Sequence, residues 1–183
     1  TLSEAAIELA PATEVGARDP APLLDLRRAV ILDSTIVEVP SERPGVVLLE
    51  DAELAGSLVA APSVDAIAAT VEESRIDAAR LLALGGTFHR VAMRLEYGAF
   101  ASAELSDVVF AGCSELRFDG SDLHYLDVPA CPPGGLRVVD SVVWDSRFVD
   151  GLRADGGEIH TSVLGAPGAV LATSGTELDL TRF

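Results

Sequence analysis

Short runs of apolar residues, with polar residues between them, recur along the chain. Four of these runs resemble one another and are rich in valine and isoleucine, at residues 31–36, 71–76, 105–110 and 138–143. Alternation of apolar and polar residues over so few positions is typical of short strands. The pattern therefore predicts a repetitive all-β chain.

The runs share one register when each repeat unit is 17 or 18 residues long. Three apolar columns then line up. The first contains Ile31, Leu49, Ala66, Ala83, Phe100, Phe118, Leu136, Ala154 and Ala172. The second contains Ile36, Leu54, Val71, Phe88, Leu105, Leu123, Ser141, Ile159 and Glu177. The third contains Val59, Ile76, Met93, Phe110, Val128 and Leu164, with Ser41 and Ser146 as polar exceptions.

A unit this short cannot bury its own apolar face, so it must stack on its neighbours. Eighteen residues are too few for a helix pair, but they suit three short strands joined by tight turns. We therefore expect an all-β fold, a right-handed parallel β-helix. About eight coils at about 4.8 Å each would give a rod roughly 38 Å long.

Two segments fit the repeat less well. We expect residues 1–30 to form an N-terminal cap or assembly segment, with a short helix over 3–10, and residues 31–183 to form the solenoid domain. Ser63 could cap a helix that buries one apolar face and ends near Gly85. A mixed α/β fold with a helix over 63–84 is therefore the alternative.

Parts of the repeat resemble known families. Small residues followed two positions later by Leu or Phe recur every five residues in 103–115, and 141–150 is similar; this resembles pentapeptide-repeat proteins. The run 136–143 resembles the β-helical segments of phage-tail and injection-particle proteins, and an 18-residue coil is shared with polymer-forming bactofilins. The resemblances have a solenoid architecture in common. Some pentapeptide-repeat proteins also imitate DNA and bind a DNA-handling enzyme.

The composition limits the kinds of partner that we expect the chain to bind. The chain has 183 residues, 49% of them hydrophobic, which is enough for one domain with a full core. Its net charge is −16, and it contains arginine but no lysine. This acidic balance disfavours direct binding to nucleic acid or to an anionic membrane. No signal peptide or membrane-spanning run is visible. We therefore expect a cytoplasmic protein or one inside an assembled particle.

The two cysteines, Cys113 and Cys131, are too few for a disulfide framework. They align at 18 residues, so we expect free thiols stacked in the core, consistent with a reducing compartment. Trp144 aligns with Val108 and Leu126 in the same register, which predicts that it packs in the core rather than serving as a sugar-stacking platform.

Three histidines are the main candidates for chemistry. His89, His124 and His160 are spaced so that they share one column, two coils apart. At twice the strand spacing they lie about 9.6 Å apart, too far to share one metal ion. We therefore interpret them as surface residues. Serine, histidine and aspartate all occur, but no nucleophile motif accompanies them.

Two acidic, glycine-bearing turns, Asp119–Asp122 and Asp150–Glu158, could hold calcium by composition alone. They lack the spacing of known calcium loops, so a solvated turn is the preferred interpretation. No glycine-rich phosphate loop occurs. We assign no catalytic, cofactor-binding or metal-binding residues and expect no cofactor.

Three functions fit these observations. The first is a non-enzymatic β-solenoid that acts as a structural or protein-interaction element, through protein partners or self-association, within a larger assembly. The second is an acidic DNA mimic that binds a DNA topoisomerase, in the manner of the pentapeptide-repeat proteins. The third is a β-helix enzyme acting on polysaccharide, which would need paired carboxylates in a groove.

Overall fold

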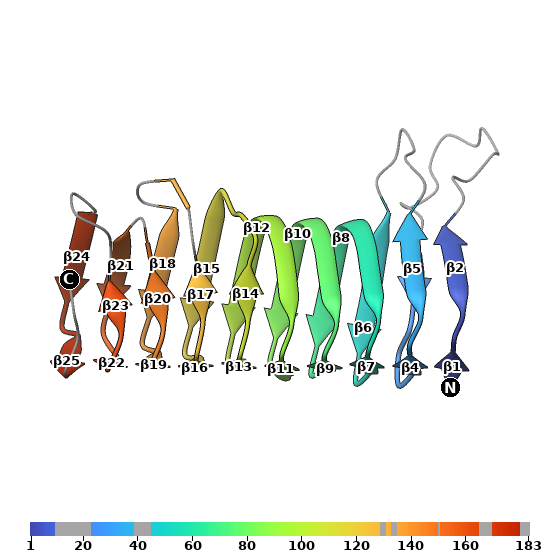
Figure 1. Cartoon of the computed structure of the whole chain (residues 1–183), viewed down its shortest axis with the longest axis horizontal. Helices are drawn as coiled ribbons and strands as arrows, with labels where there is room; N and C mark the ends of the chain where they lie inside the picture. Colours follow the sequence, from blue (N-terminus) through green and yellow to red (C-terminus); the bar gives the residue numbers. More distant parts are fainter. Residues whose placement is uncertain are drawn as a thin grey trace.

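The chain folds into stacked parallel coils that form an extended β-solenoid (Figure 1). The computed structural model describes residues 1–9, 23–38, 45–128, 131–132, 135–149, 151–164 and 170–179. These residues contain only strands and turns, without a helix. The predicted all-β solenoid is confirmed, and the mixed α/β alternative is wrong.

One side of the solenoid is a ten-stranded parallel sheet to which the successive coils each contribute a short strand. Its three-residue strands put the middle residue into the core and the flanking residues outside. In order, the strands are β1 (Leu2–Ser3), β4 (Val30–Leu32), β7 (Glu53–Ala55), β9 (Thr70–Glu72), β11 (Thr87–His89), β13 (Glu104–Ser106), β16 (Asp122–His124), β19 (Val142–Trp144), β22 (Glu158–His160) and β25 (Glu177–Asp179).

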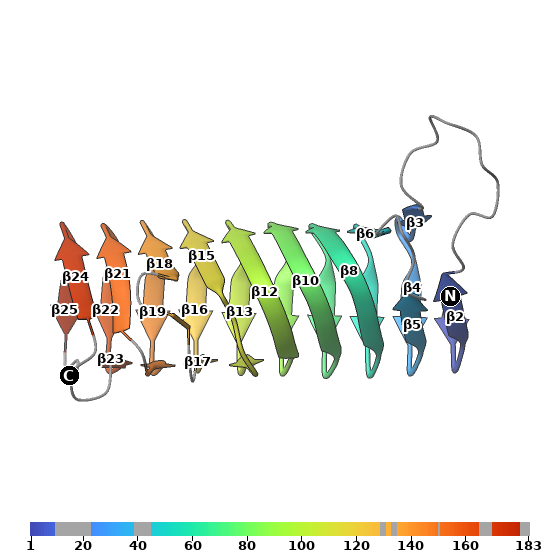
Figure 2. The same ribbon diagram turned by 90° about the horizontal axis from the view of Figure 1, so that it is seen from above.

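A fifteen-stranded sheet closes the coils and bends into two arms. The first arm contains β2 (Ala6–Leu9), β5 (Thr35–Glu38), β14 (Val109–Phe110), β17 (Asp127–Val128), β20 (Arg147–Phe148) and β23 (Val163–Leu164). The second contains β3 (Leu23–Asp25), β6 (Val46–Glu50), β15 (Glu115–Asp119), β18 (Leu136–Val139), β21 (Gly151–Asp155) and β24 (Val170–Ser174). Three ten-residue strands run through both arms (Figure 2): β8 (Leu58–Ile67), β10 (Arg75–Leu84) and β12 (Ala92–Ala101).

The segment that resembled a helix, 63–84, lies in β8, β9 and β10. Its local pattern suits either state, but β10 pairs with β8 on one side and β12 on the other over almost its whole length. Val64 and Ala66 of β8 are fully buried, as are Leu81 and Ala83 of β10. Pairing on both sides and this burial outweigh the helical periodicity.

The predicted N-terminal helix over 3–10 is also wrong. β1 pairs with β4, and β2 pairs with β5, so the described part of residues 1–30 continues both sheets. Ile7 stands in register with Ile36 and packs against the core. Alternation in Ala6–Leu9 suits a strand, and the neighbouring coil selects it. The domain boundary between 1–30 and 31–183 stays a prediction.

Most of the predicted core columns are confirmed. In the ten-stranded sheet Leu54, Val71, Phe88, Leu105 and Leu123 stack in consecutive coils. All five are buried. In the other sheet Leu49, Ala66, Ala83, Phe100 and Phe118 do the same, and the third column holds from Val59 to Val128.

The register predicted for the coil that follows residue 128 is wrong by two residues, whereas Ala154, Ile159 and Leu164 of the next coil stand in their predicted columns. Phe118 pairs with Val138 rather than Leu136, and Leu123 pairs with Val143 rather than Ser141. Val128 likewise pairs with Phe148, where Ser146 was expected. The cause is uneven coil length: Ser121 and Ser141 are 20 residues apart, whereas Ser146 and Ser162 are 16 apart.

The predicted columns also fail at both ends. The coils that contain Ser34 and Ser57 are 23 residues apart. Ile31 therefore stands in the column of Leu54, and Ile36 stands in that of Val59. At the other end Ile159 pairs with Leu178 rather than Glu177, and Ala154 pairs with Thr173 rather than Ala172. Ser41 lies outside the described residues.

A residue with positive φ turns the chain at two corners of the coils, and the residue that follows it points into the interior. Asp33 and Asp140 are examples, with φ of 47° and 45°, and each is followed by a buried serine. At the first corner the amide of Ser34 donates to Ser57 Oγ at 3.0 Å, and Ser57 Oγ donates to the Ala55 carbonyl. Buried serine hydroxyls thus satisfy backbone groups that the turn removes from the sheet ladders.

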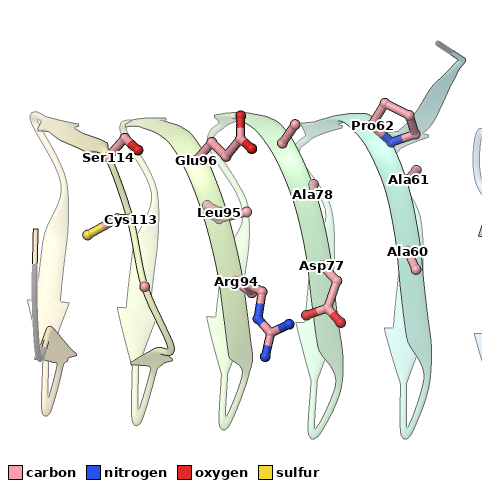
Figure 3. Close-up of a pocket in the computed structure, with 12 residues that line it drawn as sticks. Ala60, Ala61, Pro62, Asp77, Ala78, Arg94, Leu95, Glu96, Cys113 and Ser114 are labelled. Carbon is pink, nitrogen blue, oxygen red and sulfur yellow. The ribbon is translucent and has the colours of Figure 1, made fainter.

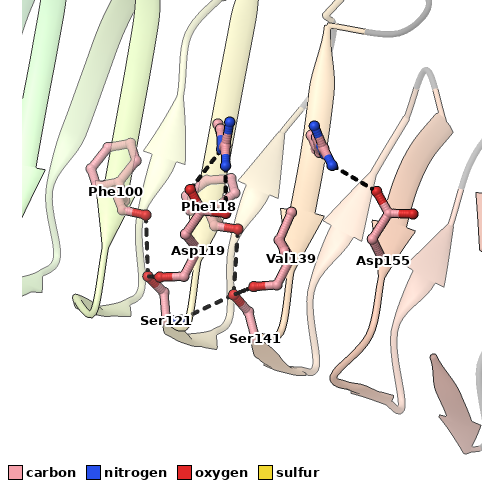
Figure 4. Close-up of polar contacts among 9 residues, drawn as sticks. Phe100, Phe118, Asp119, Ser121, Val139, Ser141 and Asp155 are labelled. Atoms are coloured by element: carbon pink, nitrogen blue, oxygen red, sulfur yellow. Dashed lines mark hydrogen bonds and ion pairs between the residues drawn. The ribbon is translucent and has the colours of Figure 1, made fainter. Parts of the chain in front are cut away.

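The second corner carries a matching pair of serines. Ser121 and Ser141 are buried, and the Ser121 amide donates to Ser141 Oγ at 3.0 Å (Figure 4). Each hydroxyl faces the carbonyl two residues back in its own coil, that of Asp119 or Val139. At both corners, hydrogen bonds to serine hydroxyls thus join one coil to the next.

Phenylalanines fill the widest part of the described core. Phe100 stacks on Phe118 with ring centroids 5.1 Å apart, and Phe88 and Phe110 meet Phe100 edge-on. All four are buried, and contacts of this kind add to the energy of apolar burial. This cluster lies at the middle of the rod.

Cys113 and Cys131 lie in neighbouring coils, as their spacing predicted, but they form a disulfide with Cα atoms 5.1 Å apart. Cys131 is buried, and Cys113 is partly exposed. The expectation of free core thiols is therefore wrong. A disulfide persists in oxidising compartments, so the expected cytoplasmic or particle localisation stays a prediction.

Candidate functional site

The outer face of the ten-stranded sheet carries the column of residues that we call the histidine stripe. Each member is the last residue of a strand and stands beside the next in register. The stripe consists of Glu72, His89, Ser106, His124, Trp144, His160 and Asp179. The predicted single column of histidines, two coils apart, is confirmed.

The stripe begins with a serine–histidine contact. His89 Nδ1 lies 2.7 Å from Ser106 Oγ and 3.9 Å from Asp107 Oδ2. A catalytic triad needs the serine and the carboxylate on opposite ring nitrogens, so that the base is oriented while it takes the serine proton. Here both groups approach the same nitrogen. The contact therefore does not have the geometry of a triad.

The second histidine of the stripe is bound within its own strand. His124 Nε2 lies 3.1 Å from Asp122 Oδ1, and the His124 ring lies beside Tyr125. The side chain of His124 is 35% exposed, as expected for an outward residue. Ion pairs this exposed contribute little to stability. His124 is a solvated surface group.

His160 is the most enclosed of the three histidines. Its side chain is only 12% exposed, and its ring stacks on Trp144 with centroids 4.0 Å apart. Nε2 lies 3.0 Å from Glu158 Oε2, and Nδ1 lies 3.6 Å from Asp179 Oδ2. The hydrogen bond with Glu158, and after it the nearby carboxylate of Asp179, raises the pKa of His160 above its ordinary value.

Trp144 was predicted in the core, and this is wrong. It is 37% exposed and stands between His124 and His160 in the stripe. The two-residue slip after residue 128 places Trp144 before the corner, in register with the outward His124. Ser146, beyond the positive-φ residue Asp145, takes the inward position beside Leu126 that was predicted for Trp144. The sequence could have shown this only through the long coil that precedes Trp144.

The stripe does not form a metal centre. Among the described residues, no group of three histidine, cysteine, aspartate or glutamate side chains is close enough to hold an ion. The stripe histidines alternate with Ser106 and Trp144, and this places them two strands apart.

The two acidic turns bind arginine and histidine side chains. Asp119 accepts two bonds from Arg117, whereas Asp122 lies across the corner beside His124. In the second turn Asp155 accepts from Arg137 and Arg153. Asp150 lies outside the described residues. The carboxylates thus pair with side chains on separate faces instead of converging on one point.

Arg117, Arg137 and Arg153 stand in register on β15, β18 and β21, and we call them the arginine ladder. Arg117 and Arg153 each bind an aspartate two residues on in the same strand. Arg137 has Val139 at that position and reaches Asp155 of the next strand at 3.0 Å. Three guanidinium groups thus share two carboxylates.

A shallow groove of about 540 Å³ crosses β8, β10 and β12 (Figure 3). Its floor contains Ala61, Ala78 and Leu95, which stand in one register column. Asp77 lies at its edge and is held by Arg75 at 2.7 Å. The groove is a small apolar surface with a charged border.

The charges of the two outer faces differ. Among the described residues, the ten-stranded sheet carries no arginine, but its outward positions include Glu53, Glu72, Glu104, Asp122, Glu158, Glu177 and Asp179. Arginines of the other sheet pair with nearby aspartates, as in Arg80–Asp65 and Arg147–Asp127. Among the described residues of these ten strands, only histidine can carry a positive charge.

Comparison with known proteins identifies no relative. No known family matches the chain, and no curated protein or solved structure is similar to it. No helix in the described part of the chain is long and apolar enough to span a membrane.

Proposed function

We propose that the chain is a non-enzymatic structural β-solenoid that joins further copies of itself end to end. The observation that carries this proposal is the backbone pairing of the outermost described strands. Among the described residues, β1 is paired on one side, with β4, and β25 is paired on one side, with β22. The outer edge of such a strand can pair with a strand of another chain.

The side chains at these edges support a second copy as the partner. Leu178 stands at the end of the inward column and is 38% exposed, and Leu2 at the other end is partly exposed. Both belong to one column, and all strand pairs are parallel. A second copy shifted along the axis would continue both sheets with the same polarity. Such head-to-tail contacts build open filaments.

The surface chemistry favours this role over catalysis. The serine–histidine contact lacks triad geometry, and Asp77 of the groove is bound to Arg75. The DNA mimic and the polysaccharide enzyme stay predictions from the sequence. The proposed assembly uses the backbone edges of the terminal strands, and these strands belong to the same two parallel sheets as the strands of the inner coils.

Light scattering on purified protein tests the proposal. The wild type should exceed its monomer mass of 19.0 kDa and grow with concentration. L178K blocks one end and I7K the other, so each variant alone should be monomeric. Their mixture should form dimers and nothing larger, because one open end of each kind remains.

A matched control is V109K, which places the same charge on an exposed position in the middle of the rod and should assemble as the wild type does. A wild type of 19.0 kDa at every concentration would contradict the proposal. Dimers of either end variant alone would contradict head-to-tail geometry, since they would show like ends pairing.

A further inference from the structure

His160 lies between the body of the solenoid and its last described strand in the ten-stranded sheet. Its register neighbours are Trp144 on β19 and Asp179 on β25. The Thr161 amide also donates to the Asp179 carbonyl at 2.9 Å, and the Glu177 amide donates to Gly157. The imidazole therefore stands where β25 is attached.

The ring can satisfy both neighbouring carboxylates only when it is protonated. Neutral imidazole has one N–H donor and one acceptor, whereas imidazolium has two donors. Glu158 faces Nε2 and Asp179 faces Nδ1, whose atom is buried and makes no hydrogen bond among the described residues. In the neutral form one lone pair must face a carboxylate. The stack on Trp144 also gains a cation–π attraction on protonation.

In the part of the chain that the structure describes, the charged side chains of β22, of β25 and of the turn after β19 are acidic, apart from His160. Glu177 of β25 stands directly opposite Glu158 of β22, an arrangement in which like charges repel. Asp145, in the turn after β19, accepts a hydrogen bond from Thr161. When His160 loses its proton, these elements carry only carboxylate charges.

We propose that protonation of His160 fastens β25 to the solenoid, so that the terminal coil is closed at lower pH and loosens as the pH rises. The raised pKa of the His160 ring determines the direction of this pH dependence. A group with a raised folded pKa stabilises fully below its ordinary value, about 6.5, and this stabilisation is lost as the pH passes the raised value. The proposal stands on the contacts of His160 and does not require end-to-end assembly.

The single tryptophan reports on the ring directly. Protonated imidazole quenches indole fluorescence on contact, so emission should rise with pH at a midpoint above 6.5. H160Q should remove this step, and D179N should lower its midpoint. H89Q, far along the stripe, should leave it unchanged. A step that survives in H160Q, or one that D179N does not move, would overturn the proposal.

Hydrogen exchange then tests whether the strand loosens. The amides of Thr161 and Glu177 bridge the terminal coils, so their protection factors, corrected for intrinsic exchange, should fall several-fold as the pH rises through the titration. Amides of Phe88 and Leu105 in the central coils should not change. H160Q should abolish the pH dependence at Thr161 and Glu177. Constant protection in the wild type, or equal pH dependence in H160Q, would refute the proposed device.

Discussion

The core column and the histidine stripe occupy adjacent positions of the same strands, yet they follow different rules. Phe88, Leu105 and Leu123 are buried, whereas His89 and His124, each the next residue, face solvent. The inward column accepts only apolar residues. The outward column holds histidine, serine, tryptophan and carboxylates. Adjacent residues of one strand thus have different roles: the inward residue packs the coils together, and the outward residue lies on the polar surface.

The largest effect should come from one charge placed on either side of this boundary. L123D would bury a carboxylate between Leu105 and Val143, which the fold cannot solvate, and should cost more than about 4 kcal/mol. H124D places the same charge on the stripe and should change stability by about 0.5 kcal/mol or less. Denaturant midpoints measure both. Equal tolerance would mean that Leu123 is not inward.

Removing a ring from the other sheet extends the comparison. F118A takes a buried side chain from the phenylalanine cluster and should cost about 3–5 kcal/mol through the cavity that it leaves. Its outward neighbour gives the control: R117A removes an exposed ion pair and should cost about 1 kcal/mol or less. Thermal unfolding followed by circular dichroism separates the two. A neutral F118A would refute the core register.

Replacing a buried serine and an outward serine by alanine should give a smaller difference in stability than the two pairs above. S57A deletes the acceptor of the Ser34 amide at a buried corner and should cost about 1–3 kcal/mol, because a backbone donor loses its partner. S106A removes a hydroxyl from the stripe, where water can replace its bond to His89, and should cost under about 1 kcal/mol. A larger loss of stability in S106A than in S57A, measured by chemical denaturation, would show that the histidine stripe contributes to stability, contrary to this prediction.

The smallest effect is expected from completing the arginine ladder. V139D supplies the carboxylate that Arg137 lacks in its own strand and should stabilise by a few tenths of a kcal/mol at low salt, and less at high salt. V138D, one residue away and inward, should be severely destabilising. A large loss in V139D would show that this position faces the core.

The sequence predicts most of this boundary but misplaces part of it. A coil of 20 residues is followed by one of 16, so the two deviations cancel over a pair of coils. The spacing of His124 and His160 therefore matched a regular repeat and was placed correctly. Trp144 and Ser146, in the coil between them, were placed two residues off. Periodicity cannot reveal errors that compensate.

The corners explain why the slip is hard to detect. Both corners can use a left-handed residue followed by a buried serine, so Asp33–Ser34 and Asp140–Ser141 look alike although they lie at different corners. Which corner a given motif occupies depends on the neighbouring coil, and this is not local information. The same holds for 63–84, where pairing on both sides selects strand over helix.

Proton–proton contacts across β13, β16 and β19 report which residues of successive coils touch, and so they test the separation of core column and histidine stripe. We expect nuclear Overhauser effects from the Leu123 methyl groups to those of Leu105 and Val143, and from the His124 ring to Trp144. Contacts of the Leu123 methyl groups with Ser141 or with the Trp144 ring would contradict the register, and with it the separation of core column and histidine stripe.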